Sequence, residues 1–168
     1  VYDKTGIAEF AAGLAEQGWK VYASGGTAKK IADAGVEVTD VSELVGGDAI
    51  LGHRVVTLSR ELYAGLLADT TKPEDMEELS RLNIPLIGLV CVDMYPLEEE
   101  IAKPGATLQD VITQTDIGGP TMLRAAAKGR RIVLSVAEQR QQVLDWLAAG
   151  KPDEADFLEK LAARTEYE

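Results

Sequence analysis

The sequence predicts an α/β fold in which a mostly parallel sheet lies between two layers of helices, a three-layer arrangement. Two observations lead to this prediction. Segments with strand-like patterns alternate along the chain with segments that have the helical period of 3.6 residues. The run "LIGLVCVDMY" at 86–95 is continuously apolar up to Asp93, which is typical of a strand buried on both faces of a parallel sheet.

The first half of the chain contains helices and strands in alternation. Apolar residues recur at helical spacing in 6–17, and a glycine ends that helix. The segment "WKVYA" at 19–23 is an apolar-rich strand, 28–35 again has helical spacing, and "VEVTDV" at 36–41 is a shorter strand. A short helix is expected at 61–68, "ELYAGLLA". The opening residues resemble the end of a first strand, so we expect the chain to begin inside that strand.

The second half closes the sheet with one more strand and several helices. A helix begins near Pro73, where proline suits the first turn, and another opens at Thr107, which is a suitable N-cap. The remaining expected elements are a helix at 119–128, a strand "RIVLSV" at 131–136, and closing helices at 138–148 and 154–165.

The composition limits the kinds of partner. The 168 residues suffice for one domain with a substantial core. The net charge of −11 argues against nucleic acid or an anionic membrane as a partner, and the longest uncharged apolar run is too short to cross a bilayer. The single cysteine, Cys91, lies in a buried strand and fits a reducing cytoplasm. An anionic ligand would need local positive charge, and the candidates, which could equally be solvated surface charges, are Lys4, Arg54, Arg124 and Lys128.

The stretch "SGGT", residues 24–27, lies between a predicted strand and a predicted helix. The first N–H groups of a helix have no partner inside it, and the helix dipole adds positive charge at the same point. Glycines allow a ligand to approach the backbone closely, and the flanking hydroxyls add donors. The pattern suits a phosphate, although two glycines also occur in ordinary turns and Thr27 could be a simple N-cap.

Several longer motifs extend this interpretation. "YDKTGI", "SGGTAKKIADAG", "HRVVTL", "MYPLEEEIAKPGATLQDVI" and "DIGGPTMLRAAAK" occur in this order. Together they resemble the inosine monophosphate (IMP) cyclohydrolase domain of the bifunctional purine biosynthesis protein. The resemblance implies a Rossmann-like α/β fold of the methylglyoxal synthase type over residues 1–168, with the family's formyltransferase domain absent. It also implies closure of a formamido-imidazole-carboxamide ribonucleotide to IMP with loss of water, the last step of purine synthesis.

The resemblance also implies which residues form the site. The phosphate cradle would comprise Lys4, Ser24, Gly25, Gly26 and Thr27. Further contacts to the nucleotide would come from Asp3, Arg54, Thr57, Asp93, Ile117, Gly118 and Gly119. The three catalytic residues would be Tyr95, Asp116 and Lys128. The reaction requires no cofactor or metal, since general acid–base groups and oxyanion donors suffice. One histidine, His53, cannot form a multi-histidine metal site.

Each catalytic candidate also has a structural interpretation. Asp116 could be the N-cap of the following helix, and Tyr95, before a proline, could be a packed loop aromatic. Lys128 fits the favourable placement of a cation near a helix C-terminus. Asp116 and Lys128 stand at opposite ends of one predicted helix, so one site would need the helix to cross the pocket or a partner subunit to contribute.

The sequence departs from the family at the reacting end. The family motif Arg-Val-Lys-Thr-Leu-His-Pro is here "RVVTLSR", so Val56 replaces a catalytic lysine, Ser59 a histidine and Arg60 a proline. Removal of one such donor typically costs a factor of about 10²–10³ in rate. In "DMYP", Asp93 replaces an asparagine, and an ionised carboxylate only accepts hydrogen bonds.

Three hypotheses follow from these residues. The first is an IMP cyclohydrolase whose activity is reduced by Val56. The second is a non-catalytic module that binds purine nucleotides, and the third, with the least support, is a methylglyoxal synthase-like lyase. The expected partners are a purine ribonucleotide, a second copy in a homodimer, and a formyltransferase domain or chain.

Overall fold

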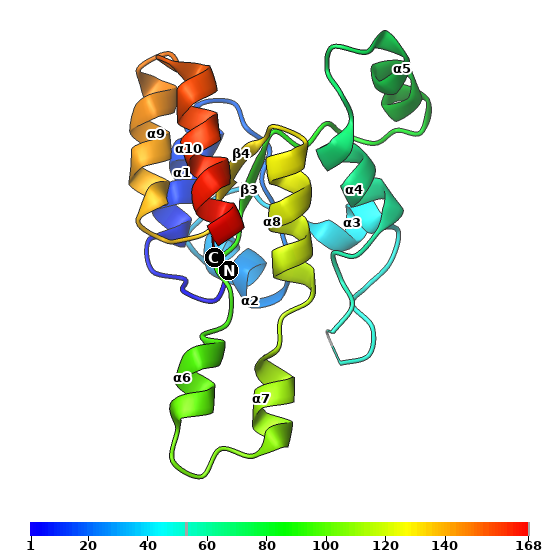
Figure 1. The fold of residues 1–168 in the computed structure, drawn as a ribbon. Helices are drawn as coiled ribbons and strands as arrows, with labels where there is room; N and C mark the ends of the chain where they lie inside the picture. Colours follow the sequence, from blue (N-terminus) through cyan, green and yellow to red (C-terminus); the bar gives the residue numbers. More distant parts are fainter. Residues whose placement is uncertain (53, 168) are drawn as a thin grey trace.

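The computed structural model describes residues 1–52 and 54–167 and has the predicted α/β character, with strands at the centre and helices around them (Figure 1). The strands form two parallel pairs. β1 (Tyr22–Ala23) pairs with β2 (Thr39–Asp40), and β3 (Leu89–Cys91) pairs with β4 (Ile132–Leu134). The order of elements alternates between strands and helices, as in a sheet whose neighbouring strands are parallel.

Helices cover both sides of the strands. On one side lie α1 (Ile7–Glu16) and α9 (Gln139–Ala148), and on the other lie α8 (Gly118–Lys128) and α4 (Arg60–Leu67) (Figure 1). The helix α10 (Glu154–Tyr167) packs on β4 and α8. The other helices are α2 (Gly25–Asp33), α3 (Val41–Val45), α5 (Pro73–Arg81), α6 (Leu97–Ala102) and α7 (Leu108–Gln114).

One hydrophobic core joins these layers. Side chains of every layer meet in it, including Phe10 of α1, Leu66 of α4, Leu123 of α8, Val133 of β4 and Val143 of α9. Burial of such side chains supplies most of the free energy that favours folding. The core therefore fixes the helices relative to the strand ends, where the predicted site residues lie.

The structure corrects several boundaries. The strands are shorter than their apolar runs, and Val41 begins a helix rather than continuing the strand predicted at 36–41. The helix α6 was not predicted. Val1 and Tyr2 do not belong to a strand, and the sheet consists of two separate pairs where one continuous sheet was expected.

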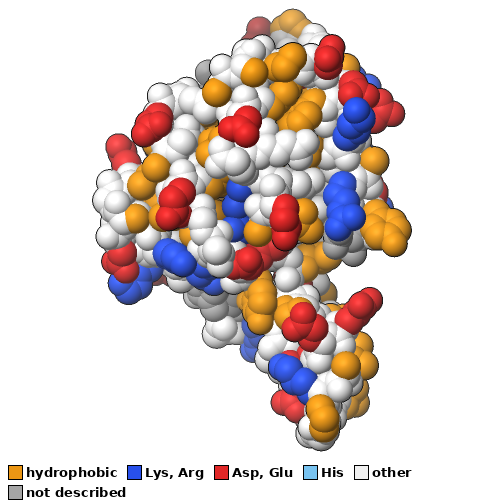
Figure 2. Space-filling view, turned by 90° about the vertical axis from the view of Figure 1, so that its left-hand side faces the viewer, with side chains coloured by type: hydrophobic (Ala, Val, Ile, Leu, Met, Phe, Trp, Pro, Cys, Tyr) orange, Lys and Arg blue, Asp and Glu red, His pale blue; other side chains and the backbone are white. Residues whose placement is uncertain are grey.

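The hairpin of α6 and α7 projects from the body as an arm (Figures 1 and 2). A reciprocal capping box between Thr107 and Asp110 begins α7. Apolar side chains of the arm, including Ile101, Leu108 and Ile112, are exposed next to the acidic first turn of α6. Within the described residues, no helix has the length and apolar character needed to cross a membrane.

Candidate functional site at the helix N-termini

The turn between β1 and α2 has the geometry that the sequence predicted. Ser24 is the N-cap residue and has extended backbone angles, and its hydroxyl makes no capping hydrogen bond. Gly25 follows with a φ of 52°, a left-handed conformation that glycine adopts without strain. The first turn of α2 contains no acidic residue. The first N–H groups and the Ser24 hydroxyl therefore remain available to an anion.

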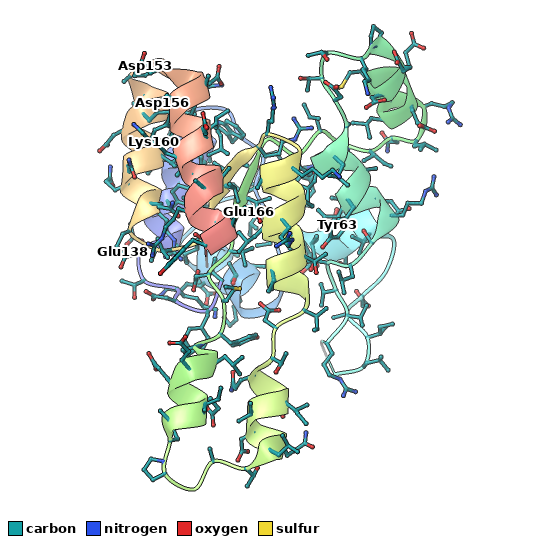
Figure 3. All side chains as sticks on the ribbon, viewed as in Figure 1. Tyr63, Glu138, Asp153, Asp156, Lys160 and Glu166 are labelled. Atoms are coloured by element: carbon teal, nitrogen blue, oxygen red, sulfur yellow. The ribbon has the colours of Figure 1, made fainter. Side chains whose placement is uncertain are left out.

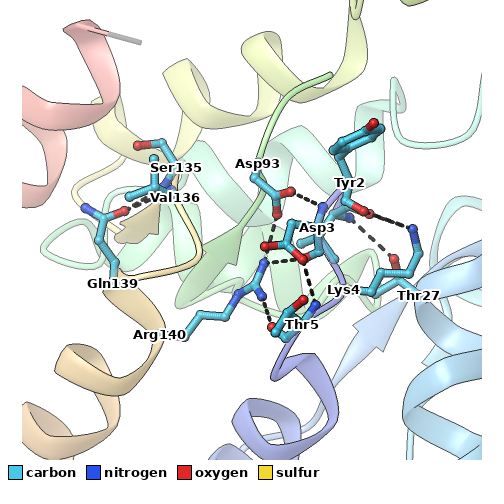
Figure 4. A network of polar contacts seen from close by, with 11 residues as sticks. Tyr2, Asp3, Lys4, Thr5, Thr27, Asp93, Ser135, Val136, Gln139 and Arg140 are labelled. Carbon is cyan, nitrogen blue, oxygen red and sulfur yellow. Dashed lines mark hydrogen bonds and ion pairs between the residues drawn. The ribbon is translucent and has the colours of Figure 1, made fainter. Parts of the chain in front are cut away.

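The opening residues of the chain lie against this turn (Figure 4). The Lys4 ammonium donates to the main-chain oxygens of Val1, at 3.1 Å, and Tyr2, at 3.4 Å. A Cβ atom built on Gly26 would lie 3.4 Å from the Lys4 Cε, so the lysine stem passes beside the N-terminus of α2. The Val1 amino group lies 3.4 Å from the Thr27 hydroxyl. Lys4 therefore lies next to the N-terminus of α2.

The N-terminus of α8 forms a second wall. One oxygen of Asp116 accepts from the Gly119 N–H at 3.1 Å, so Asp116 caps this helix. A Cβ on Gly119 would lie 2.2 Å from the other Asp116 oxygen, and a Cβ on Gly118 would lie 3.2 Å from the Thr57 hydroxyl. Asp116 would have to move if Gly119 carried a Cβ, whereas the contact at Gly118 would only become tight. The contact brings Thr57 to the "DIGG" loop, although 61 positions separate Thr57 from Gly118 along the chain.

The N-terminus of α2 opens onto a cavity of about 680 Å³, and Thr57 on the wall of this cavity lies against Gly118 at the N-terminus of α8. Ser24, Thr27, Thr57 and Val92 all line it. The N-terminus of α2, three hydroxyl groups and the neighbouring Lys4 make this end of the cavity, here called the mouth, a suitable site for an anion. The protein is strongly acidic overall, so an anionic ligand needs local positive potential. The helix N-terminus and Lys4 supply it here.

Tyr95 lies beside the same opening residues. Its ring is 48% exposed and contacts the Tyr2 ring edge to face, with the ring centroids 5.5 Å apart. Ile117, between Asp116 and the glycines, is exposed. Tyr95 is therefore a loop aromatic on the surface.

Arg54 and Val56 lie in the loop before α4. The Arg54 side chain is exposed and donates from Nε to the Leu51 main-chain oxygen at 2.7 Å. Val56 is half-buried. His53, to which no role was assigned, lies outside the described residues.

Lys128 does not join Asp116 in this chain. The two residues stand at opposite ends of α8, and ten residues of helix rise by about 15 Å. The Lys128 side chain is exposed. The residue after it, Gly129, contacts the C-terminal end of α4, since a Cβ there would lie 2.0 Å from the Leu66 main-chain oxygen.

Arg124, another of the cationic candidates, forms an ion pair with α10. It lies one turn before the end of α8 and pairs with Glu166 of α10 at 3.3 Å, and Figure 3 shows Glu166 beside α8. Tyr63 of α4 lies on the opposite side of α8 in the same view. Burial raises the pKa of the Tyr63 hydroxyl, which favours its neutral form.

Sequence reasoning missed Arg140, which organises the opening residues (Figure 4). Its buried guanidinium donates to the main-chain oxygens of Thr5, at 2.6 Å, and Asp3, at 2.8 Å, and to Asp93 Oδ1 at 2.9 Å. The second Asp93 oxygen accepts from the Asp3 N–H. Both oxygens of Asp93 are therefore engaged within the chain, and its position supports the loop that carries Lys4. The Asp3 side chain caps its own turn through the Thr5 N–H.

Two groups near the cavity have shifted pKa values. Burial lowers the pKa of the Val1 amino group, and burial raises the pKa of the Cys91 thiol. Both shifts favour the neutral form, as expected where charge is poorly solvated. Within residues 1–52 and 54–167, no group of three or more acidic, cysteine or histidine side chains could hold a metal ion.

Comparisons with known proteins agree with this architecture. The family model described as "MGS-like domain" matches residues 6–121. The bifunctional purine biosynthesis protein PurH of Staphylococcus saprophyticus is 43% identical over 157 residues, which cover 92% of this chain and 32% of that protein. The chain thus spans about a third of the length of this curated relative. A solved structure, "Crystal structure of ForH", is similar to this chain with a TM-score of 0.85 and 35% sequence identity. The superposition covers 98% of this chain and 86% of the ForH chain.

These findings confirm the predicted α/β fold of the methylglyoxal synthase type and the resemblance stated from the motifs. The matched region contains the turn at 24–27, Thr57, Tyr95 and the "DIGG" loop, whereas Lys4 and Lys128 lie outside it. The chain belongs to the MGS-like domain family.

Proposed function

We propose that this chain is an IMP cyclohydrolase domain, which closes the ring of 5-formamidoimidazole-4-carboxamide ribonucleotide and expels water to give IMP. The observation that carries the proposal is that the uncapped N-terminus of α2, with Lys4 beside it, opens onto a cavity whose wall residue Thr57 lies against the N-terminus of α8. The similarity to PurH, whose printed name assigns it to purine biosynthesis, supports this choice of substrate.

The 5′-phosphate of the nucleotide would bind at the N-terminus of α2. Its oxygens would accept from the free N–H groups and from the hydroxyls of Ser24 and Thr27. The Lys4 ammonium now donates to two main-chain oxygens, and a small movement of its flexible stem would bring it to the phosphate. The remaining ligand would extend from the cradle toward Thr57 and the N-terminus of α8.

The reaction needs proton transfer and stabilisation of an oxyanion. The carboxamide nitrogen must lose a proton as it attacks the formyl carbon, and the formyl oxygen gains negative charge before it leaves as water. In this proposal, Tyr95 and Asp116 serve these steps at the mouth. The Asp116 oxygen that accepts from Gly119 would stay in place as a cap, and the other would face the ligand. Val56 offers neither a proton nor positive charge, so the expected rate is low.

Lys128 would act in the site of a second copy, because it lies a helix length from Asp116. This arrangement requires a homodimer. It predicts that Lys128→Ala and Asp116→Asn are each inactive and that a mixture of the two regains up to about a quarter of the wild-type activity by forming mixed dimers. The control is Arg124→Ala, one turn earlier on the same helix, whose pair with Glu166 is exposed. It should keep full activity. No recovery in the mixture would contradict the shared site.

A second candidate is a purine nucleotide-binding module without catalysis. Two observations favour it, namely Val56 at the position of a family lysine and the distance between Lys128 and Asp116 along α8. In either case we propose that the protein acts in the cytoplasm and that a formyltransferase domain or chain supplies the formylated precursor.

One experiment separates the two candidates. The purified protein is mixed with the formylated precursor, and the absorbance of IMP is followed. Turnover supports the cyclohydrolase. Absence of turnover with intact binding of IMP supports the binding module.

Calorimetry tests the phosphate site that both candidates share. IMP should bind more tightly than inosine, and Lys4→Ala should weaken IMP binding by about tenfold to a hundredfold, which is the usual worth of a charge-assisted hydrogen bond. The matched control is Lys29→Ala, which removes the same charge from the surface of α2, where Lys29 pairs with Asp33. Equal affinity for IMP and inosine would refute the phosphate site.

A further inference from the structure

A buried arginine holds the loop that precedes α1. Arg140 lies in the first turn of α9 and is 5% exposed. Its guanidinium donates to the main-chain oxygens of Asp3, at 2.8 Å, and Thr5, at 2.6 Å (Figure 4). Asp3 and Thr5 are the two neighbours of Lys4 along the chain. The backbone on either side of Lys4 is therefore attached to α9.

Asp93 joins this attachment to the end of β3. One of its oxygens accepts from Arg140 at 2.9 Å, and the other accepts from the Asp3 N–H. A buried guanidinium is unfavourable unless acceptors surround it, and here one carboxylate and two carbonyl oxygens do so. The planar guanidinium presents five N–H donors in a fixed geometry, which suits several acceptors at once, whereas an ammonium is a single compact centre.

The Lys4 side chain runs from this loop to the N-terminus of α2. A Cβ on Gly26 would lie 3.4 Å from the Lys4 Cε, and the ammonium donates to two main-chain oxygens. These acceptors are neutral, and a hydrogen bond to an ionised acceptor is roughly twice as strong. An anion at α2 is therefore the better partner for the ammonium, provided that the Lys4 backbone stays where it is.

Arg140 also compensates the negative charge closest to this loop. The Asp93 carboxylate accepts from the residue before Lys4. Without the guanidinium, this charge would attract the Lys4 ammonium and repel an anion. Arg140 thus acts on Lys4 in two ways, through the backbone and through the charge of Asp93.

We propose that Arg140 is a positioning residue for the anion site, which holds Lys4 at the N-terminus of α2 and so determines the preference for a phosphorylated over an unphosphorylated nucleoside. The proposal rests on the phosphate site proposed above. Arg140 does not touch the ligand in this account. Its effect on affinity passes through Lys4 and therefore depends on the phosphate.

A double-mutant cycle in binding tests this dependence. Calorimetry gives the dissociation constants of IMP and inosine for wild type, Arg140→Lys, Lys4→Ala and the double variant. Arg140→Lys keeps a positive charge beside Asp93 but not the fixed set of donors. It should weaken IMP binding by about threefold to tenfold, in the lower part of the range for residues of one network, and leave inosine binding unchanged. In the Lys4→Ala background it should change IMP binding by less than about twofold, because the residue through which it acts is gone.

Arg131→Lys is the matched control. Arg131 is a second buried arginine, 8% exposed, and it donates to the main-chain oxygens of Leu66 and Ala68 at the end of α4. It precedes β4, whereas Arg140 follows this strand. Arg131→Lys should lower Tm and leave the ratio of IMP to inosine affinity unchanged.

A second variant covers the case in which Arg140→Lys does not fold. Arg140→Met combined with Asp93→Asn removes both charges of the pair, so no charge stays buried without compensation. The asparagine still offers an acceptor to the Asp3 N–H. This variant lacks the attachment to α9 and should show the same fall in the ratio of IMP to inosine affinity.

Three results would overturn the proposal. The first is an unchanged affinity ratio in a folded Arg140 variant. The second is equal weakening of IMP and inosine, because Arg140 would then support the fold in general. The third is a loss of IMP affinity that is just as large in the Lys4→Ala background. All three leave the phosphate site intact, whereas equal affinity of the wild type for IMP and inosine would refute that site and this inference together.

Discussion

Substitution of Asp93 by alanine should destabilise the protein strongly, because it removes the acidic partner of a buried arginine. The side chains of Arg140 and Asp93 are 6% and 13% exposed, and their atoms lie 2.9 Å apart. Removal of one partner from a buried pair costs about 3–5 kcal/mol, since the other charge stays buried without compensation. Arg140 keeps two main-chain acceptors, so we expect the lower end, about 3 kcal/mol. For a protein of this size, that loss corresponds to a fall in Tm of about 6–12 °C.

Urea unfolding followed by tryptophan fluorescence measures this change in the free energy of unfolding. The matched control is Asp33→Ala, which breaks an ion pair on the surface. The Asp33 side chain is 64% exposed and that of its partner Lys29 is 74% exposed. Exposed pairs contribute about 0.5 kcal/mol or less. A double-mutant cycle with Arg140→Ala isolates the coupling between the two partners, which should exceed 1 kcal/mol, roughly the range for groups in contact. If Asp93→Ala costs no more than Asp33→Ala, the ion pair does not stabilise the fold and the reasoning is wrong.

Three further predictions concern other contacts. Gly129→Ala should destabilise the protein by about 1–3 kcal/mol, since its Cβ would lie 2.0 Å from a main-chain oxygen of α4, whereas Gly47→Ala, with nothing within 4 Å, should be nearly neutral in the same urea assay. Hydrogen bonds from Thr107 lower the pKa of Asp110, so their contribution to stability is complete above the ordinary pKa and is lost as the pH falls through the lowered pKa. Thr107→Val should raise the pKa of Asp110 measured by NMR titration. An unchanged pKa would exclude the cap. If the chain turns over the precursor, Val56→Lys should increase the rate by roughly tenfold, and a folded variant with no gain would favour the binding module.

Local patterns determined much of the helical structure and the cradle. The helix at 6–17, the helix after Pro73 and the capped helix at Thr107 all form close to their predicted bounds, because apolar period, proline placement and capping are properties of neighbouring residues. The turn at 24–27 likewise has the predicted form, with Gly25 left-handed at the start of α2. Such features depend on residues a few positions apart, which the sequence displays directly.

Contacts between distant segments could be decided only by the tertiary structure. Asp93 pairs with Arg140, 47 positions away, and no local pattern marks that partner. The strand predicted at 19–23 is paired only at Tyr22 and Ala23, since a strand forms where another strand lies beside it. The contact of Thr57 with Gly118 joins residues that no local pattern connects. A sequence shows which side chains are available, whereas packing of the core decides which of them meet.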